Sequence, residues 1–365
     1  MTNHWIDIKN ADAVLIMGSN AAEHHPVCFK WVMKAKDNGA CIMHVDPKFS
    51  RTSARCDFHV PLRSGTDIAF LGGMINYILN TGTWFADYVL NYTNASFIVG
   101  EGYSFDNGLF SGYDPARRAY DRKKWDFERG PDGEPLQDMS LRHERCVFNL
   151  LKKHYSRYTL DKVSAVTGVP PEMLLRVYKT FCATGKPDKA GTILYALGWT
   201  QHTVGAQNIR ASAIIQLLLG NIGNAGGGIN ALRGEPNVQG STDHALLYDN
   251  LPGYLPLPRA DWQTLADFNS ANTPATALKK SINWSVNRPK YFTSLLKGWF
   301  GKEATPENEY CYSLLPKGDD GANYSYLEMM EKANNGEMKG GIIFGVNPMG
   351  SFPDVNKMRP ALDKL

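Results

Sequence analysis

The stretch "ADAVLIMGSNAAEHHPVCFKWVMKAKDNGACIMHVDP", residues 11–47, decides the fold class. It opens with an apolar run that ends at Gly18 and continues with apolar residues at helical spacing. A second apolar run then ends at Asp46. Strand, turn, helix and strand in this order form the first half of a doubly wound parallel sheet. The sequence therefore predicts an α/β protein.

Further elements extend this pattern along the chain. The segment 58–67, "FHVPLRSGTD", predicts a third strand followed by a helix that Thr66 or Asp67 caps. Residues 99–140 are rich in glycine, proline, charge and aromatic residues, which predicts a surface insertion. Helices are expected near 142–155, 170–185 and 205–220, and strands at 191–198 and in "GGIIFG", residues 340–345. Residues 224–240 are expected to form a glycine-rich loop.

The composition of the chain disfavours several classes of function. The 365 residues carry a net charge of +3 from 39 basic and 36 acidic side chains, which gives no reason to expect nucleic acid or an anionic membrane as partner. The apolar runs are too short to span a bilayer, and no export signal opens the chain. The six cysteines form no C-x-x-C pair and the nine histidines no H-x-x-x-H pair, so no metal site is expected from this chain alone. The adjacent His24 and His25 are not expected to face one site.

Two turns share one pattern. "VLIMGSN" (14–20) and "IIFGVNP" (342–348) place a glycine after four and three apolar residues respectively, and an asparagine two residues later. Ligands of open α/β sheets bind beyond the carboxyl ends of the strands, where glycine permits close approach and asparagine offers donors and an acceptor. Two similar turns far apart in sequence indicate two half-sites for one elongated ligand.

Several residues favour a nucleotide. Asp46, at the end of the second strand, accepts hydrogen bonds from a ribose or base, or is a turn residue before Pro47. Asp67 accepts from a guanine, or caps its helix. The helix starts that follow Gly18 and Gly65 offer backbone donors to a pyrophosphate. Because "GSNAAE" replaces the G-x-G-x-x-G fingerprint, a plain NAD dehydrogenase is not favoured.

A single arginine stands out in "NAGGGINALRGEPNVQG", residues 224–240. Arg233 lies between three consecutive glycines and an Asn-Val-Gln-Gly. Either it is a solvated arginine on a surface linker, or its forked guanidinium binds a carboxylate or phosphate.

Four segments together carry a resemblance to a known family: residues 1–26, 45–71, 195–243 ("YALGWTQHTVGAQNIRASAIIQLLLGNIGNAGGGINALRGEPNVQGSTD") and 344–353 ("FGVNPMGSFP"). The chain resembles the middle portion of the catalytic subunit of molybdenum- or tungsten-dependent formate dehydrogenases. These belong to the bis-molybdopterin guanine dinucleotide (dimethyl sulfoxide reductase) family. The resemblance implies two Rossmann-like αβα domains, 1–235 and 236–365, the second incomplete.

The resemblance also implies roles for individual residues. Arg233 matches the arginine that holds the formate carboxylate at the metal, with Gln201 and His202 either near it or structural. The positions implied to bind the cofactor are Gly18, Ser19, Asn20, Asp46, Arg63, Gly65, Asp67, Gly198, Trp199, His202, Gln239, Gly240, Gly345, Asn347 and Pro348.

The implied activity is oxidation of formate to carbon dioxide at a molybdenum or tungsten centre held by two molybdopterin guanine dinucleotides. The implied partners are an iron–sulfur electron-transfer subunit and a membrane cytochrome subunit, and the full enzyme is expected in the periplasm. The family's [4Fe–4S] domain, its metal-ligating cysteine or selenocysteine with the histidine that follows, and its C-terminal domain have no counterpart in these residues. We therefore expect a fragment read from the first Met after a selenocysteine codon, inactive and cofactor-free in isolation. The alternatives are a non-catalytic dinucleotide-binding chain and a reductase for nitrate or another oxoanion.

Overall fold

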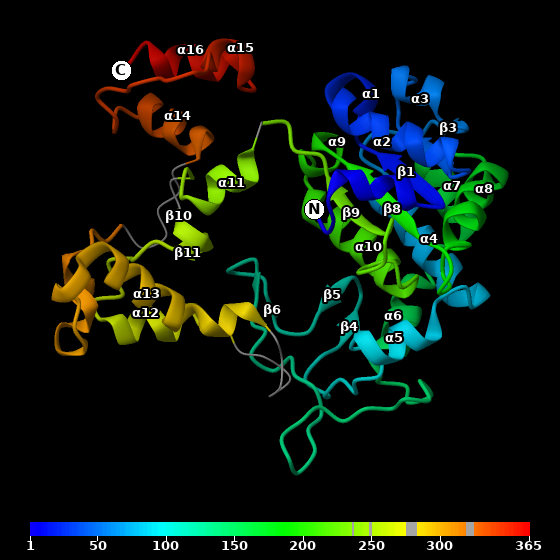
Figure 1. The fold of residues 1–365 in the computed structure, drawn as a ribbon, viewed down its shortest axis with the longest axis horizontal. Coiled ribbons are helices and arrows are strands. Elements are labelled where there is room, and N and C mark those ends of the chain that lie inside the picture. The colour runs from blue at the N-terminus through cyan, green and yellow to red at the C-terminus, as the bar shows by residue number, and fades with distance from the viewer. Residues whose placement is uncertain (236, 248–249, 275–282, 319–324) are drawn as a thin grey trace. The chain divides into compact units, whose positions relative to one another are not determined.

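The computed structural model describes residues 1–235, 237–247, 250–274, 283–318 and 325–365. The chain forms two compact units (Figure 1). One contains Met1–Val238, and the other contains Gln239 and the described residues that follow it.

A five-stranded parallel sheet is the centre of the first unit. Its strand order, β3-β2-β1-β8-β9, places the first strand between the second and the eighth, which is the doubly wound arrangement that the sequence predicts. In register, Ala13 pairs with Cys41 on one side and with Gly191 on the other. The strands are β1 (Ala13–Met17), β2 (Cys41–Val45), β3 (Phe58–Val60), β8 (Gly191–Tyr195) and β9 (Gly228–Ala231).

Helices pack on both faces of this sheet because alternate strand residues point to opposite sides. Val14 and Ile16 of β1 pack with Val32 of α2, whereas Leu15 and Met17 belong to a larger cluster that includes Phe70 of α4. The helices of this unit are α1 (Ala21–His24), α2 (Pro26–Asp37), α3 (Arg51–Arg55), α4 (Asp67–Thr81), α5 (Ala86–Tyr92), α6 (Val147–Tyr155), α7 (Leu160–Thr167), α8 (Pro171–Cys182), α9 (Leu197–Thr200) and α10 (Gly205–Leu218), preceded by the 3₁₀ helix η1 (Trp5–Asn10). The α/β class is confirmed.

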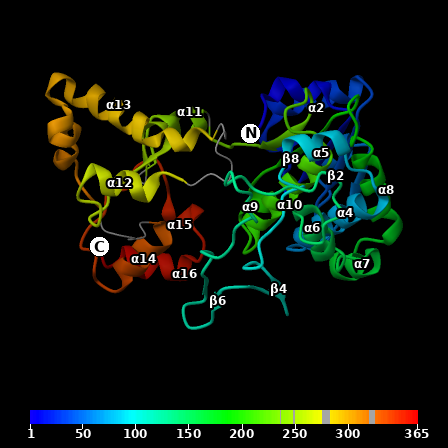
Figure 2. The same ribbon diagram turned by 90° about the horizontal axis from the view of Figure 1, so that it is seen from below.

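The segment 99–140 (the excursion) projects away from the sheet in both ribbon views (Figures 1 and 2). It contains two short hairpins and a cluster of aromatic rings that includes Tyr103, Phe110 and Trp125. The hairpin strands are β4 (Phe105–Asp106), β5 (Leu109–Phe110), β6 (Tyr113–Asp114) and β7 (Ala119–Tyr120).

In the second unit, the described residues from 250 to 315 pack around the buried aromatic rings of Phe268, Phe292 and Tyr312. The elements of this unit are β10 (Asn250–Leu251), β11 (Leu255–Pro256), α12 (Leu265–Asn272), α13 (Arg288–Phe300), α14 (Tyr326–Asn334), α15 (Pro348–Ser351) and α16 (Val355–Leu362), with the 3₁₀ helices η2 (Pro252–Tyr254), η3 (Trp284–Asn287), η4 (Gly301–Glu303) and η5 (Pro306–Leu314). Helices α14 and α16 contact each other. Helix α11 (Val238–Asp243) lies where the two units divide.

The strand expected at 340–345 is wrong. These residues have no regular secondary structure, and Ile342 and Phe344 are 83% and 84% exposed. An apolar run gains ladder hydrogen bonds only from a neighbouring strand, and none of the described residues pairs with this segment. The expected loop at 224–240 also needs correction, because Gly228–Ala231 within it form β9 beside β8.

Candidate functional site: a cleft at the carboxyl ends of the strands

A cleft of about 820 Å³ lies within the first unit, at the carboxyl ends of four of its five strands. Such a volume lies in the upper part of the range for ligand sites, and its position is where open α/β sheets bind ligands. The lining residues follow β1, β2, β8 and β9: Gly18, Ser19, Asn20, His24, His25, Asp46, Tyr195, Ala196, Leu197, Gly198, Thr200, Ala231, Leu232, Arg233, Gly234, Glu235 and Val238.

Two glycines join the turns after β1 and β8. The backbone N–H of Gly198 donates to the carbonyl oxygen of Gly18, with 3.0 Å between N and O. A Cβ on Gly18 would lie 2.7 Å from the backbone nitrogen of Trp199, and one on Gly198 would lie 2.6 Å from the Cα of Gly18. Gly18 also has a φ of +61°, a backbone angle that residues with a side chain rarely adopt. These glycines are therefore required for the two turns to pack, whatever ligand the cleft binds.

Ser19 and Asn20 differ in what their side chains contact. Ser19 is 5% exposed and its Oγ has no hydrogen-bond partner among the described residues. The side chain of Asn20 is already bonded, because its Oδ1 accepts from Thr52 Oγ1 at 2.8 Å and its amide donates to Glu23. A buried hydroxyl without a partner is costly, so Ser19 is the residue of this turn that is ready to bind a polar ligand group.

Asp46 is partly buried at the end of β2 and lines the cleft. Its Oδ1 accepts the backbone N–H of Lys48 at 3.0 Å, which is the turn role that the sequence left open. Its Oδ2 lies 3.8 Å from Nε2 of the buried His44. One carboxylate oxygen therefore holds the turn, and binding of a ribose or guanine by Asp46 stays a prediction.

His44 gives the first unit a dependence on pH. Burial lowers the pKa of His44 from 6.5 to about 4, with Asp46 opposing part of the shift. The unfolded chain then binds more protons than the folded one between these values, so stability is full above pH 6.5 and falls as the pH drops to 4. We expect a loss of roughly 3 kcal/mol over this window, since each pKa unit corresponds to about 1.4 kcal/mol.

Denaturant unfolding of the first unit at pH 7 and pH 4.5 measures this effect. His44→Gln should remove most of the difference between the two pH values. The control His244→Gln, at an exposed position of the second unit, should retain it. An unchanged pH dependence in His44→Gln would assign the acid sensitivity to other groups.

Asp67 is buried at the start of α4 and is bonded within the protein. Trp199 Nε1 donates to Asp67 Oδ1 at 3.1 Å, and burial raises the pKa of Asp67. Trp199 is itself fully buried, with its ring stacked on Tyr195 at a centroid distance of 5.3 Å. The pair ties the start of α4 to the turn after β8. Neither residue lines the cleft.

The other expected site residues of the first unit, Arg63, Gly65 and His202, also lie outside the cleft lining. Arg63 donates through Nη1 to the carbonyl oxygen of Val166 at 2.6 Å, near the end of α7. Gly65 has a φ of +79° with open space around it, and His202 is exposed before α10. Cofactor binding by these residues stays a prediction.

Five of the expected site residues lie in the second unit: Gln239, Gly240, Gly345, Asn347 and Pro348. Gln239 accepts from Tyr254 Oη through its backbone oxygen at 3.4 Å. Asn347 caps α15 by accepting from the N–H of Gly350 at 3.2 Å, and Gly345 has a φ of +66°. The turn that resembles 18–20 is therefore formed even though no strand precedes it, and its role in ligand binding stays a prediction.

Arg233 follows β9 and its exposed side chain lines the cleft. Its guanidinium has no hydrogen bond or ion pair within the part of the chain that the structure describes. Burial lowers the pKa of the Met1 amino group, and the positive charge of Arg233 lowers it further. Burial raises the pKa of Tyr195, and the charge of Arg233 offsets part of that rise. The carboxylates of Asp46 and Glu235 also line the cleft, but neither is paired with this guanidinium, which is therefore able to bind an anionic group of a ligand.

His24 and His25 are among the cleft residues that sequence reasoning missed. Both line the cleft, contrary to expectation, because α1 ends at His24 and the chain turns at His25 into α2. The available signal was their position shortly after the Gly-x-Asn turn, where a loop follows a parallel strand. Over the described residues, no group of three or more His, Cys, Asp or Glu side chains is arranged to hold a metal ion.

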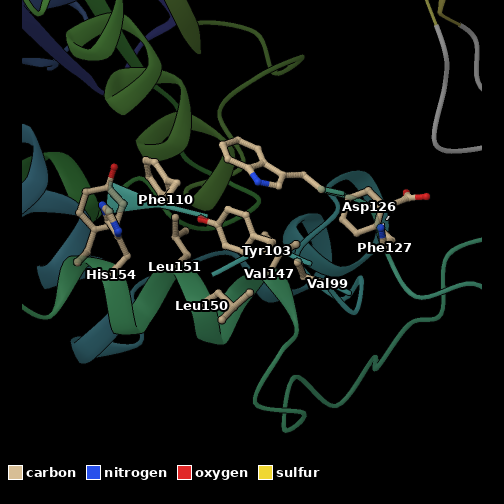
Figure 3. A pocket seen from close by; sticks show the side chains of 11 residues that line it. Val99, Tyr103, Phe110, Asp126, Phe127, Val147, Leu150, Leu151 and His154 are labelled. Atoms are coloured by element: carbon tan, nitrogen blue, oxygen red, sulfur yellow. Dashed lines mark hydrogen bonds between the residues drawn. The ribbon is translucent and has the colours of Figure 1, made fainter. Parts of the chain in front are cut away.

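A second cavity, of about 390 Å³, lies between the excursion and α6 (Figure 3). Leu150, Leu151 and His154 of α6 face the rings of Tyr103 and Phe110 across it. Burial lowers the pKa of His154, so its imidazole is favoured in the neutral form there. The lining is mostly apolar and aromatic, and it brings together fewer polar groups than the cleft at the strand ends.

No helix among the described residues has the length and apolar character that a bilayer crossing requires.

Comparison with known proteins identifies the family. The Molybdopterin oxidoreductase family profile matches residues 1–103 and 147–365. Over its full length the chain is 73% identical to formate dehydrogenase 2 subunit alpha (cytochrome c-553) of Nitratidesulfovibrio vulgaris, and 57% identical to formate dehydrogenase subunit alpha of Megalodesulfovibrio gigas. It spans 36% of the length of each of these relatives. Acetylene hydratase from Pelobacter acetylenicus aligns at 20% identity with a TM-score of 0.41, over 61% of this chain and 25% of that one. Because the family profile matches most of its residues, this chain belongs to the molybdopterin oxidoreductases.

Proposed function

We propose that the chain is a segment of a formate dehydrogenase catalytic subunit, which oxidises formate to carbon dioxide. The observation that carries the proposal is identity of 73% and 57% to two formate dehydrogenase alpha subunits over all 365 residues. We assign residues 1–235 and 236–365 to two αβα domains of that subunit.

The cleft in the first unit fits part of a molybdopterin-type cofactor. The unpartnered hydroxyl of Ser19 offers a donor, and the free guanidinium of Arg233 attracts negative charge. Among the described residues, one carboxylate oxygen of Asp46 faces no donor other than His44, and so accepts from a ribose or a base. We propose a guanine dinucleotide here, with Gly18, Asn20 and Gly198 shaping the wall of the cleft.

A second guanine dinucleotide is proposed on Gly345, Asn347 and Pro348, with Gln239 and Gly240 along the cofactor. Arg63, Gly65, Asp67, Trp199 and His202 complete the proposed set around the first dinucleotide. When bound, the molybdenum or tungsten cofactor supplies the two-electron redox chemistry.

The proposed role of Arg233 is to hold formate. A guanidinium presents two parallel N–H donors to a carboxylate, and formate has no other group for recognition. Because no described residue competes for this guanidinium, it is available to the anion. In the intact enzyme we propose electron transfer to an iron–sulfur subunit and a membrane cytochrome subunit, in the periplasm, through a [4Fe–4S] cluster of the same subunit.

Purification of the intact catalytic subunit that contains this chain, under anaerobic conditions, tests the function. Formate-dependent reduction of a viologen dye is expected, with release of carbon dioxide and no reduction of nitrate by the reduced dye. Mass spectrometry of metals and of acid-released nucleotide should find molybdenum or tungsten together with GMP. Nitrate reduction without formate oxidation would instead indicate an oxoanion reductase. GMP without either activity would indicate a non-catalytic dinucleotide-binding protein.

A further inference from the structure

The backbone that carries Arg233 is anchored immediately before its side chain. The N–H of Leu232 donates to the carbonyl oxygen of Tyr195 at 2.8 Å, which extends the pairing of β9 with β8. Beyond Arg233 the chain is less tightly packed, since nothing lies within 4 Å of a Cβ built on Gly234, and Glu235 is exposed. The peptide of Arg233 therefore needs a further contact to keep one orientation.

The imidazole of His25 supplies that contact. Its Nε2 lies 3.1 Å from the carbonyl oxygen of Arg233, a residue 208 positions away in the sequence. A carbonyl oxygen only accepts, so Nε2 carries the proton and donates. The other ring nitrogen, Nδ1, is buried without a partner among the described residues, which suits an unprotonated nitrogen.

His25 is a rigid support for this bond. It immediately precedes Pro26, the first residue of α2, and its own N–H donates to the carbonyl oxygen of Ala21 at 2.9 Å. Its carbonyl oxygen accepts the N–H of Phe29 at 2.9 Å. Its ring packs against Trp5 in a T-shaped arrangement, with centroids 6.2 Å apart and planes at 88°.

We infer that His25 is a positioning residue for Arg233, whose carbonyl it holds so that the guanidinium stays over the cleft. In the isolated chain, the effect of His25 on the position of the Arg233 backbone follows from the hydrogen bond alone. Its effect on formate binding rests on the proposed function. Burial lowers the pKa of His25, so the ring is neutral at neutral pH and adds no charge beside Arg233.

Two pairs of variants separate the hydrogen bond from the packing of the ring. His25→Phe keeps a ring against Trp5 but has no donor, whereas His25→Gln places an amide nitrogen close to the position of Nε2. His25→Asn has the same amide on a shorter side chain that does not reach Arg233. It gives a second comparison with glutamine should phenylalanine prevent folding. His244→Phe, at an exposed position in the second unit, is the control.

Limited trypsin digestion of the 365-residue chain measures the positioning directly. Cleavage after Arg233 is quantified by mass spectrometry, relative to cleavage after the exposed Arg118 of the β6–β7 hairpin. Loss of one hydrogen bond should speed cleavage after Arg233 about threefold to tenfold in His25→Phe and His25→Asn. His25→Gln and His244→Phe should match the unaltered chain. Equal rates in all variants, or a rate in His25→Gln as high as in His25→Asn, would overturn the inference.

Kinetics of the intact enzyme give the second readout. His25→Phe should raise the KM for formate about threefold to tenfold, more than it changes kcat, with metal and GMP content unchanged. His25→Gln should restore the KM. If cleavage after Arg233 responds as expected but formate kinetics respond neither to His25 nor to Arg233, the proposed function fails and the positioning stands. If cleavage does not respond, the positioning fails whatever the substrate.

Discussion

Alanine in place of Gly18 should lower the free energy of unfolding of the first unit by about 3–4 kcal/mol. Two costs add in this variant. The new Cβ would lie 2.7 Å from the backbone nitrogen of Trp199, and backbone cannot move aside as a flexible side chain does. Overpacking of this kind costs roughly 2–3 kcal/mol. The left-handed φ of +61° adds about 1 kcal/mol for a residue with a Cβ.

Two further variants in the same unit separate these costs. Gly198→Ala introduces only the close contact, since its Cβ would lie 2.6 Å from the Cα of Gly18 and its φ is not left-handed. Gly39→Ala introduces only the strain, because Gly39 has a φ of +95° with nothing within 4 Å. We expect losses of roughly 2–3 and 1 kcal/mol respectively.

Denaturant-dependent hydrogen exchange of peptides from β1 and β8 measures these stabilities within the first unit, without assuming that both units unfold together. Gly234→Ala is the matched control, because it lies on the cleft wall with open space around it and no left-handed φ. Equal stabilities for Gly18→Ala and Gly39→Ala would show that the turns separate at little cost.

Lysine in place of Arg233 should lower kcat/KM for formate about 10- to 100-fold in the intact enzyme, and alanine should lower it about 1000-fold. A charge-assisted hydrogen bond contributes roughly 1.5–3 kcal/mol. Lysine retains the charge but loses the parallel pair of donors, whereas alanine loses both bonds. Steady-state assays with a viologen acceptor over a range of formate concentrations measure the effect.

The control for Arg233 is Arg117→Lys, at an exposed position in the excursion. It should leave formate kinetics unaltered. Metal and GMP content should be the same in all these variants, because the change concerns the substrate. A lysine variant with unaltered formate kinetics would reject Arg233 as the carboxylate clamp.

The sequence pattern predicted those strands whose own apolar residues are enough to indicate that they are buried. β1, β2 and β8 are apolar runs that end at a turn, as strands covered on both faces require. β9 was missed because "GINA" has little strand propensity, and it is held by β8 and by the buried Asn230, which donates to Thr192 Oγ1 at 2.9 Å. The segment at 342–344 has the opposite character, with strand propensity but no paired neighbour in the part of the chain that the structure describes.

The same distinction applies to the cleft. Gly18, Asp46 and Arg233 were predicted as ligand-binding residues, and the parallel sheet brings them to one edge. The bonds from His25 to Arg233 and from Trp199 to Asp67 join residues 208 and 132 positions apart. No local pattern encodes such pairs. The sequence therefore indicates which residues end strands, while the fold decides which side chains those residues meet.

The exposed run Ile342–Phe344 has a consequence for handling the protein. From Gly340 to Gly350 the sequence contains no charged residue, and Ile342 and Phe344 are almost fully exposed. An uncharged apolar segment with strand propensity readily forms intermolecular β-structure, and flanking charges or proline are what limit this. In this sequence, Lys339 and Pro348 are the charged residue and the proline that limit intermolecular β-structure. Concentrated solutions of this chain should therefore aggregate through this segment, and a charged residue at position 342 or 344 should improve its solubility.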